Sequence, residues 1–129
     1  MLAQATAELP LECCGLLAGP PSQDGLALCV RRCYPLVNAA ASPTEYESEA
    51  HSILAADKDM RAMGWTVLAI FHSHPTSPPV PSRKDVERNY YGDTVVHLII
   101  SLQSAQPEVR GWWLSDAGVF EADWDVVED

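Results

Sequence analysis

Two segments of the chain are apolar almost without interruption, which is typical of strands that are buried on both faces. These segments are WTVLAIFHSH at 65–74 and TVVHLIISL at 94–102. A shorter apolar run, CGLLAG at 14–19, predicts another buried strand that ends at the turn GPPSQDG, residues 19–25. The segment LALCVRRCYPLVN at 26–38 is rich in β-formers, and we expect it to pair with the 14–19 strand as a hairpin.

Three other segments have the composition or apolar spacing of helices. MLAQATAEL at 1–9 contains helix formers and is stopped by Pro10. Residues 48–63 carry an apolar stripe and precede Gly64, a residue typical of the end of a helix. SRKDVERNYYGD at 82–93 predicts a third helix, which we expect to end at the glycine within it.

The C-terminal third of the chain contains two further β-rich segments. EVRGWWLS at 108–115 predicts an edge strand, and GVFEADWDVV at 118–127 predicts a last strand or a terminal extension. The whole acidic segment 116–129 is accordingly an edge strand or a tail. Helices interspersed with strands, including a hairpin, predict an α/β (α+β) fold with one mixed, mainly antiparallel sheet flanked by helices. At this length we expect a single domain over residues 1–129.

The charge of the chain narrows the classes of partner. Its formal net charge is −10 and it has only eight lysines and arginines, which argues against nucleic-acid binding. No apolar run approaches the roughly 20 residues of a membrane span, and the N-terminus lacks the features of a signal peptide. We therefore expect a cytoplasmic protein that does not bind membranes. We interpret the acidity as a solvated C-terminal tail, and adaptation to a salty cytoplasm remains open.

The four cysteines do not have the spacing of a typical zinc ribbon. Cys13 and Cys14 are adjacent, which makes a poor metal clamp and a strained disulfide, and Cys29 and Cys33 follow in an apolar segment. We expect all four to be small buried hydrophobic residues, with a cysteine zinc site as the alternative.

The segment FHSHPTSPPVPSRKD at 71–85 carries the strongest chemical pattern. In an extended strand, His72 and His74 project to the same face with Cα atoms roughly 6.5–7 Å apart. Ser82 and Asp85 have the spacing of a helix capping box, so an ordinary strand end followed by a capped helix also explains the segment. Two histidines and an aspartate would instead form a three-ligand zinc site with a fourth position open to water.

A hydrolytic zinc site also requires a general base. Glu12 is the acid that stands next to an apolar strand, within LPLECCGLLAG. From the residues alone, it is equally a base beside the metal and a solvent-facing glutamate at the end of a helix.

Taken together, these residues resemble the JAMM/MPN+ (Mov34/MPN/PAD-1) family of zinc metallopeptidases. The family pattern is a distant glutamate, H-[ST]-H-P, a serine separated from the second histidine by seven residues that include this proline, two further residues and an aspartate. The chain matches it in full with Glu12, His72-Ser73-His74-Pro75, Ser82 and Asp85, and PLECCGLLAG and Asn38 also look like the family. The resemblance is to the small prokaryotic members and implies an MPN/cytidine-deaminase-like fold.

The resemblance also implies a role for each matched residue. His72, His74 and Asp85 would bind one zinc ion per chain, and Glu12 would act as the general base that activates the zinc-bound water. Ser82 would stabilise the oxyanion, whereas Ser73 and Pro75 would shape the loop.

The implied reaction is hydrolysis of a peptide or isopeptide bond after the C-terminal Gly-Gly of a ubiquitin-like sulfur-carrier protein. The alternatives are a non-catalytic MPN scaffold and a zinc hydrolase of small peptides. A homodimer remains open.

Three other positions have less specific interpretations. We expect His97 to be a hydrogen-bonded strand histidine and His51 to face solvent. One ring of Trp112 and Trp113 is expected in the core and the other outward. An outward ring near the site could line a groove for an extended glycine-rich tail, but core packing is the preferred interpretation.

Overall fold

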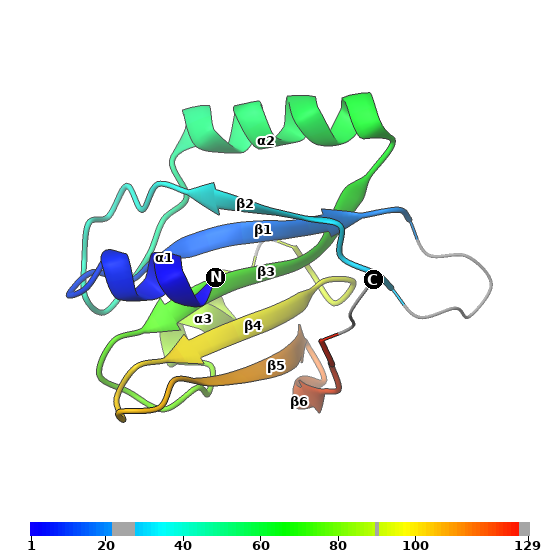
Figure 1. The fold of residues 1–129 in the computed structure, drawn as a ribbon. Coiled ribbons are helices and arrows are strands. Elements are labelled where there is room, and N and C mark those ends of the chain that lie inside the picture. The colour runs from blue at the N-terminus through cyan, green and yellow to red at the C-terminus, as the bar shows by residue number, and fades with distance from the viewer. Residues whose placement is uncertain (22–27, 90, 127–129) are drawn as a thin grey trace.

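The computed structural model describes residues 1–21, 28–89 and 91–126, and these ranges contain a six-stranded sheet and three helices (Figure 1). The helices are α1 (Leu2–Ala7), α2 (Ala50–Met63) and α3 (Arg83–Glu87). The strands are β1 (Cys14–Gly19), β2 (Arg32–Leu36), β3 (Thr66–His74), β4 (Val96–Ser101), β5 (Glu108–Ser115) and β6 (Gly118–Ala122). None of the described helices is long and apolar enough to cross a bilayer.

Strand β3 lies inside the sheet, whose order is β2-β1-β3-β4-β5-β6. It pairs antiparallel with β1 and parallel with β4, whereas the other neighbouring strands pair antiparallel. The predicted mixed, mainly antiparallel sheet is therefore confirmed. The hairpin of β1 and β2 is also confirmed, although turn residues 22–25 lie outside the described part of the chain.

Helices cover both faces of the sheet (Figure 1). Ile70 of β3 shares a buried cluster with Met60 of α2, whereas Phe71, the next residue, shares a cluster with Ala5 of α1. Side chains alternate along a strand, so His72 and His74 project to the same face as Ile70. The two histidines therefore lie on the face that α2 covers, at the C-terminal end of β3.

Helix α3 is shorter than the sequence predicts, because it ends at Glu87 rather than near Gly92. Arg88 has already left helical geometry, with φ −102° and ψ 28°. The side-chain amide of Asn89 donates hydrogen bonds to the carbonyls of Gly92 and Leu114. Such side-chain bonds to the backbone compete with a further helical turn. The predicted continuation of the helix is therefore wrong.

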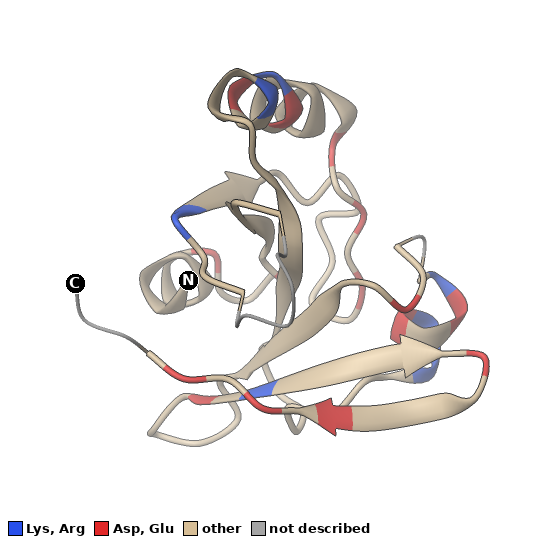
Figure 2. Ribbon diagram, turned by 90° about the vertical axis from the view of Figure 1, so that its right-hand side faces the viewer, with Lys and Arg blue, Asp and Glu red and all other residues tan. Residues whose placement is uncertain are grey.

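The C-terminal strands also differ from the prediction. β5 is an interior strand, because β6 pairs antiparallel along it and forms the edge of the sheet. Residues 123–126 continue beyond β6 outside the sheet, so the described part of segment 116–129 supplies both an edge strand and an extension. Acidic residues are also carried by α2, α3 and the loop before α2 (Figure 2). The acidity is thus not confined to a C-terminal tail.

The cysteines occupy unequal environments. Cys13 and Cys14 are buried, Cys33 is half-buried and Cys29 is exposed; all four are free thiols. The prediction of four buried cysteines is wrong for Cys29, because β2 begins only at Arg32 and the preceding described residues are exposed. The prediction of one tryptophan ring in the core and one outward agrees with the structure, in which Trp112 is buried and Trp113 is partly exposed. His51 is exposed on α2, as expected.

Candidate metal centre

His72 and His74 meet at the end of β3, where both side chains are buried. Only 1% of His72 and 4% of His74 is exposed, and their Nε2 atoms lie 3.1 Å apart. His74 Nδ1 lies 2.8 Å from the carbonyl oxygen of Pro78, and donation of a hydrogen bond there leaves Nε2 as a lone-pair donor. A partner on one ring nitrogen is the usual way in which a protein orients a metal-ligating histidine.

The proline-rich loop after β3 is attached to the neighbouring strands by two side chains. Ser101 of β4 donates a hydrogen bond to the carbonyl of Ser77 at 2.6 Å. The indole Nε1 of Trp112 in β5 donates to the carbonyl of Pro79 at 2.8 Å. Together with the contact between His74 and Pro78, these bonds engage the carbonyls of three successive loop residues. This attachment fixes where the chain starts α3.

Asp85 reaches the histidines from the first turn of α3. Ser82 is the N-cap, and the predicted capping box is present: Ser82 Oγ accepts from the Asp85 backbone N–H at 3.1 Å, and Asp85 Oδ2 accepts from the Ser82 N–H at 2.8 Å. The same Oδ2 atom lies 3.1 Å from His72 Nε2 and 3.2 Å from His74 Nε2. Burial opposes ionisation of Asp85, but its hydrogen bonds with His72 and His74 hold its pKa below the usual range.

The three ligand atoms are spaced as a tetrahedral zinc site requires. Bonds of about 2.0–2.2 Å at tetrahedral angles put neighbouring ligand atoms about 3.3–3.6 Å apart, and the observed spacing is only slightly tighter. The separations between His72 Nε2, His74 Nε2 and Asp85 Oδ2 are 3.1–3.2 Å. Two imidazoles and one carboxylate are also a donor set that zinc accepts. The residues therefore fit such an ion.

Glu12 lies beside this set, so the interpretation as a solvent-facing helix-end glutamate is wrong. Its side chain is 3% exposed, and its Oε1 has no hydrogen-bond partner in the described part of the chain. Burial raises its pKa from 4.5 to about 7. Glu12, His72 and His74 could themselves hold a metal ion, because one ligand atom from each lies within 4.8 Å of the others. This second set is looser than the set with Asp85.

The backbone around Glu12 is held by buried hydrogen bonds. Ser73 Oγ accepts from the Cys13 N–H at 2.8 Å, and the Ser73 N–H donates to the Cys13 carbonyl at 3.1 Å. Asn38 Nδ2 donates to the Glu12 carbonyl at 3.0 Å. Ser73 belongs to β3, so the expectation that it shapes the following loop is wrong. It ties the segment that carries Glu12 to the strand that carries both histidines.

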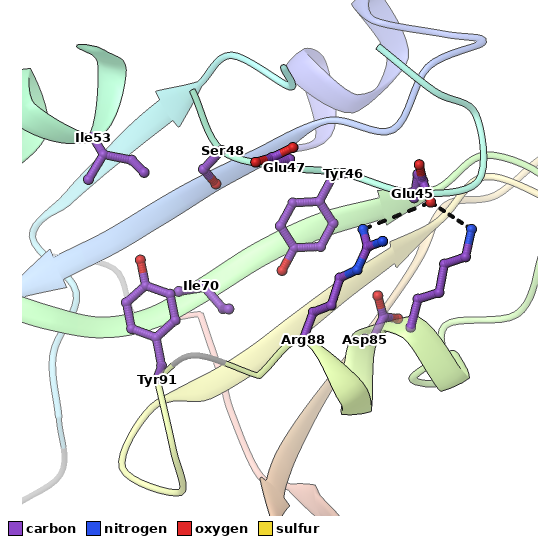
Figure 3. A pocket seen from close by; sticks show the side chains of 10 residues that line it. Glu45, Tyr46, Glu47, Ser48, Ile53, Ile70, Asp85, Arg88 and Tyr91 are labelled. Carbon is purple, nitrogen blue, oxygen red and sulfur yellow. Dashed lines mark hydrogen bonds and ion pairs between the residues drawn. The ribbon is translucent and has the colours of Figure 1, made fainter. Parts of the chain in front are cut away.

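A cleft of about 550 Å³ opens beside Asp85, between the loop before α2 and the segment that contains α3 (Figure 3). Ile70 of β3 lies along it. Glu45 of the loop pairs with Lys84 at 2.6 Å and, more distantly, with Arg88 at 3.9 Å. These ion pairs link the two walls of the cleft next to Asp85 (Figure 3).

Sequence reasoning missed Tyr46 and the role of Trp112. Tyr46 lines the cleft and stacks on His72, with ring centroids 4.6 Å apart and an interplanar angle of 23°. An aromatic residue inside a polar loop carries no signal of this contact. His97 is buried in β4, but its Nε2 finds no hydrogen-bond partner among the described residues, in contrast to the expected bonded histidine. Burial lowers the pKa of His97 to about 4.

The model of the family described as prokaryotic homologs of the JAB domain (Prok-JAB) matches residues 1–115. The chain belongs to this family. The predicted family and the predicted class of enzyme, a hydrolase of peptide or isopeptide bonds, are thereby confirmed, because curated relatives of this JAB-domain chain are named for such activities.

Two of these relatives match over most of the chain. The CysO-cysteine peptidase of Mycobacterium tuberculosis is 32% identical over 128 residues, which cover 99% of this chain and 85% of the relative. The desampylase of Pyrococcus furiosus is 33% identical over 106 residues, which cover 82% of this chain and 69% of the relative.

Solved structures agree with the fold. The solution structure of a protein from Desulfitobacterium hafniense matches with a TM-score of 0.88 and 38% identity, covering 100% of this chain and 87% of that one. A JAB1/MPN domain protein from Archaeoglobus fulgidus matches with a TM-score of 0.59 over 98% of this chain and 90% of that one. At 20% identity the second likeness shows the fold alone, and it confirms the MPN-type fold predicted for this JAB-domain chain.

Proposed function

We propose that this chain is a zinc-dependent peptidase that hydrolyses the bond after the C-terminal Gly-Gly of a ubiquitin-like sulfur-carrier protein. The observation that carries the proposal is the convergence of His72 Nε2, His74 Nε2 and Asp85 Oδ2 within 3.2 Å of one another, beside a buried glutamate. Relatives named CysO-cysteine peptidase and desampylase support the substrate class. A scaffold domain would need none of these groups.

His72, His74 and Asp85 would hold the zinc ion in this proposal. When bound, zinc supplies a Lewis acid that polarises the scissile carbonyl and brings the pKa of water to about 7. The alternative set that includes Glu12 is less suitable, because it would use the general base as a ligand and leave Asp85 without a role at the metal.

Glu12 is the group that moves the proton. Its carboxyl is buried and its Oε1 is free of hydrogen bonds to the described residues, so it can accept a proton from the attacking water and give it to the leaving amine. A pKa near neutrality suits both transfers, and burial raises that of Glu12 to about 7. The backbone bonds to Asn38 and Cys13 hold the carboxyl on the side of the histidines.

Ser82 would stabilise the developing charge on the carbonyl oxygen. Its Oγ accepts a hydrogen bond from the Asp85 N–H, which leaves its own O–H available as a donor. The helix cap therefore uses the Ser82 oxygen as an acceptor, whereas the proposed catalytic role uses the hydroxyl hydrogen as a donor.

The cleft beside Asp85 offers a path for an extended substrate tail. It runs from Asp85 past Tyr46 and Ile70 towards Ile53 (Figure 3). A tail that ends in two glycines could enter next to the ion pair between Glu45 and Lys84 without displacing it, since glycine has no side chain. A glycine tail is therefore compatible with the cleft as it stands, which supports a sulfur carrier as the substrate.

A pair of matched substrates tests the proposed reaction. We expect cleavage of a sulfur carrier that ends in Gly-Gly-Cys or is joined through Gly-Gly to a lysine side chain, and about 100-fold slower cleavage when both glycines are replaced by alanine. Mass spectrometry of the products after incubation with zinc-loaded protein measures the cleavage position. Tight zinc binding without cleavage of either glycine-tailed substrate would favour a scaffold. Equal rates for the glycine and alanine tails would instead favour a hydrolase of small peptides.

A further inference from the structure

The two histidines of the metal centre are oriented by different means. His74 has a backbone carbonyl, that of Pro78, within 2.8 Å of its Nδ1. The corresponding Nδ1 of His72 is buried and has no hydrogen-bond partner in residues 1–21, 28–89 and 91–126. A zinc-binding histidine usually donates from its second ring nitrogen to a carboxylate, carbonyl or water, which fixes the plane of the ring. Among the described residues, a contact of another kind orients His72.

The aromatic ring of Tyr46 provides that contact. It lies 4.6 Å from the imidazole centroid at an angle of only 23°, which is a stacked arrangement. A stacked neighbour restricts rotation of the imidazole about its bond to Cβ, because a turned ring would collide with the phenol ring. The stack leaves the edge that carries Nε2 directed at His74 and Asp85, 3.1 Å from each ligand atom.

Tyr46 is itself held firmly, although it lies in a loop. Asn38 Nδ2 donates to the Glu45 carbonyl at 3.1 Å, and Asn38 Oδ1 accepts from the Glu47 N–H at 3.0 Å. The side chain of Asn38 thus forms hydrogen bonds with the backbone on both sides of Tyr46. The same amide donates to the carbonyl of Glu12. Asn38 therefore fixes the position of Tyr46, the stacking residue, relative to Glu12, the proposed general base.

We propose that Tyr46 is the positioning residue for His72, setting the plane of the imidazole by stacking where His74 uses a hydrogen bond. This inference rests on the metal site proposed above and adds a residue outside the motif to it. The ring of Tyr46, rather than its hydroxyl group, carries the effect. Tyr46 takes no part in the reaction and acts on the metal only through His72.

Zinc affinity, measured by competition with a chelator, tests the role of the ring. We expect Tyr46→Phe to bind zinc within about twofold of wild type, and Tyr46→Leu to bind about 10-fold more weakly, as for loss of other contacts that orient a ligand. Tyr91→Leu is the matched control, because Tyr91 lines the same cleft and is exposed. The control should leave zinc affinity unchanged. Thermal unfolding of the metal-free variants shows how much each change affects the fold itself.

Two outcomes would overturn the proposal. Wild-type zinc affinity in folded Tyr46→Leu would show that stacking does not orient His72. An equal loss in Tyr46→Phe and Tyr46→Leu would assign the effect to the hydroxyl group. A purely structural role would lower the unfolding temperature of metal-free Tyr46→Leu without changing the zinc affinity of the folded protein.

NMR of the wild-type protein provides a test that needs no variant. We expect nuclear Overhauser effects between the ring protons of Tyr46 and His72 in both the metal-free and the zinc-loaded protein. Their absence from zinc-loaded protein would overturn the positioning role even if Tyr46→Leu does not fold. If wild-type protein bound no zinc, the proposed function would fail, while the spectra of metal-free protein would still show whether Tyr46 fixes the ring.

Discussion

Glu12→Gln is expected to lower kcat by about a thousandfold, because it removes the group that transfers the proton and keeps its size. Zinc content should stay at the wild-type level, since Glu12 is outside the tighter ligand set. Stability of the metal-free protein should not fall, because the change removes an ionisable group that is 3% exposed with an unpaired Oε1. Steady-state cleavage of a Gly-Gly-Cys carrier and metal analysis of the same sample give both values.

Glu47→Gln is the matched control for this prediction. Glu47 is exposed and lines the cleft, so its change alters charge near the substrate without touching the proposed proton path. We expect an effect on kcat below about threefold, as is typical of an exposed group with weak electrostatic coupling. An active Glu12→Gln variant would assign the general base to another group.

Asp85→Ala is expected to reduce zinc affinity by at least about 100-fold and to abolish cleavage at ordinary zinc concentrations. Asp85 supplies the only carboxylate oxygen that lies within 3.2 Å of both histidine nitrogens in the described part of the chain. Its loss leaves two imidazoles and only the looser set that includes Glu12, which we expect to bind zinc weakly. Chelator competition on metal-free protein measures the change.

Ser82→Ala separates metal binding from helix capping. Both variants break the capping box, which costs about 1 kcal/mol of stability, but only Asp85→Ala removes a proposed ligand. Ser82→Ala should therefore keep its zinc affinity. If Asp85→Ala bound zinc normally while Glu12→Gln lost it, the ligands would be Glu12, His72 and His74, the looser set within 4.8 Å.

The sequence was most informative where local geometry determines the structure. A near-continuous apolar run predicted the interior strand β3, and strand alternation placed His72 and His74 on one face. The spacing of Ser82 and Asp85 predicted the capping box. The approach of Glu12 to the histidines is a long-range contact, made when β1 pairs with β3 and Ser73 bonds to Cys13. The residues alone left Glu12 an even choice, and the family resemblance decided it.

Other features depend on tertiary contacts that leave no local signal. Helix α3 stops early because Asn89 bonds to the backbone of Gly92 and Leu114. Strand β5 looks like an edge strand until β6 pairs with it. Tyr46 lies in a polar loop, and its stack on His72 arises only from the way Asn38 holds that loop. Each of these depends on a partner distant in sequence or on a side-chain bond that competes with helix.

The most direct test of the metal centre is an anomalous difference map from crystals grown with stoichiometric zinc, with data collected on both sides of the zinc absorption edge. We expect one strong peak about 2.0–2.2 Å from His72 Nε2, His74 Nε2 and Asp85 Oδ2, with the Glu12 carboxyl beyond bonding distance. A peak bonded to Glu12 in place of Asp85, a peak at the cysteines alone, or no peak at the end of β3 would contradict it.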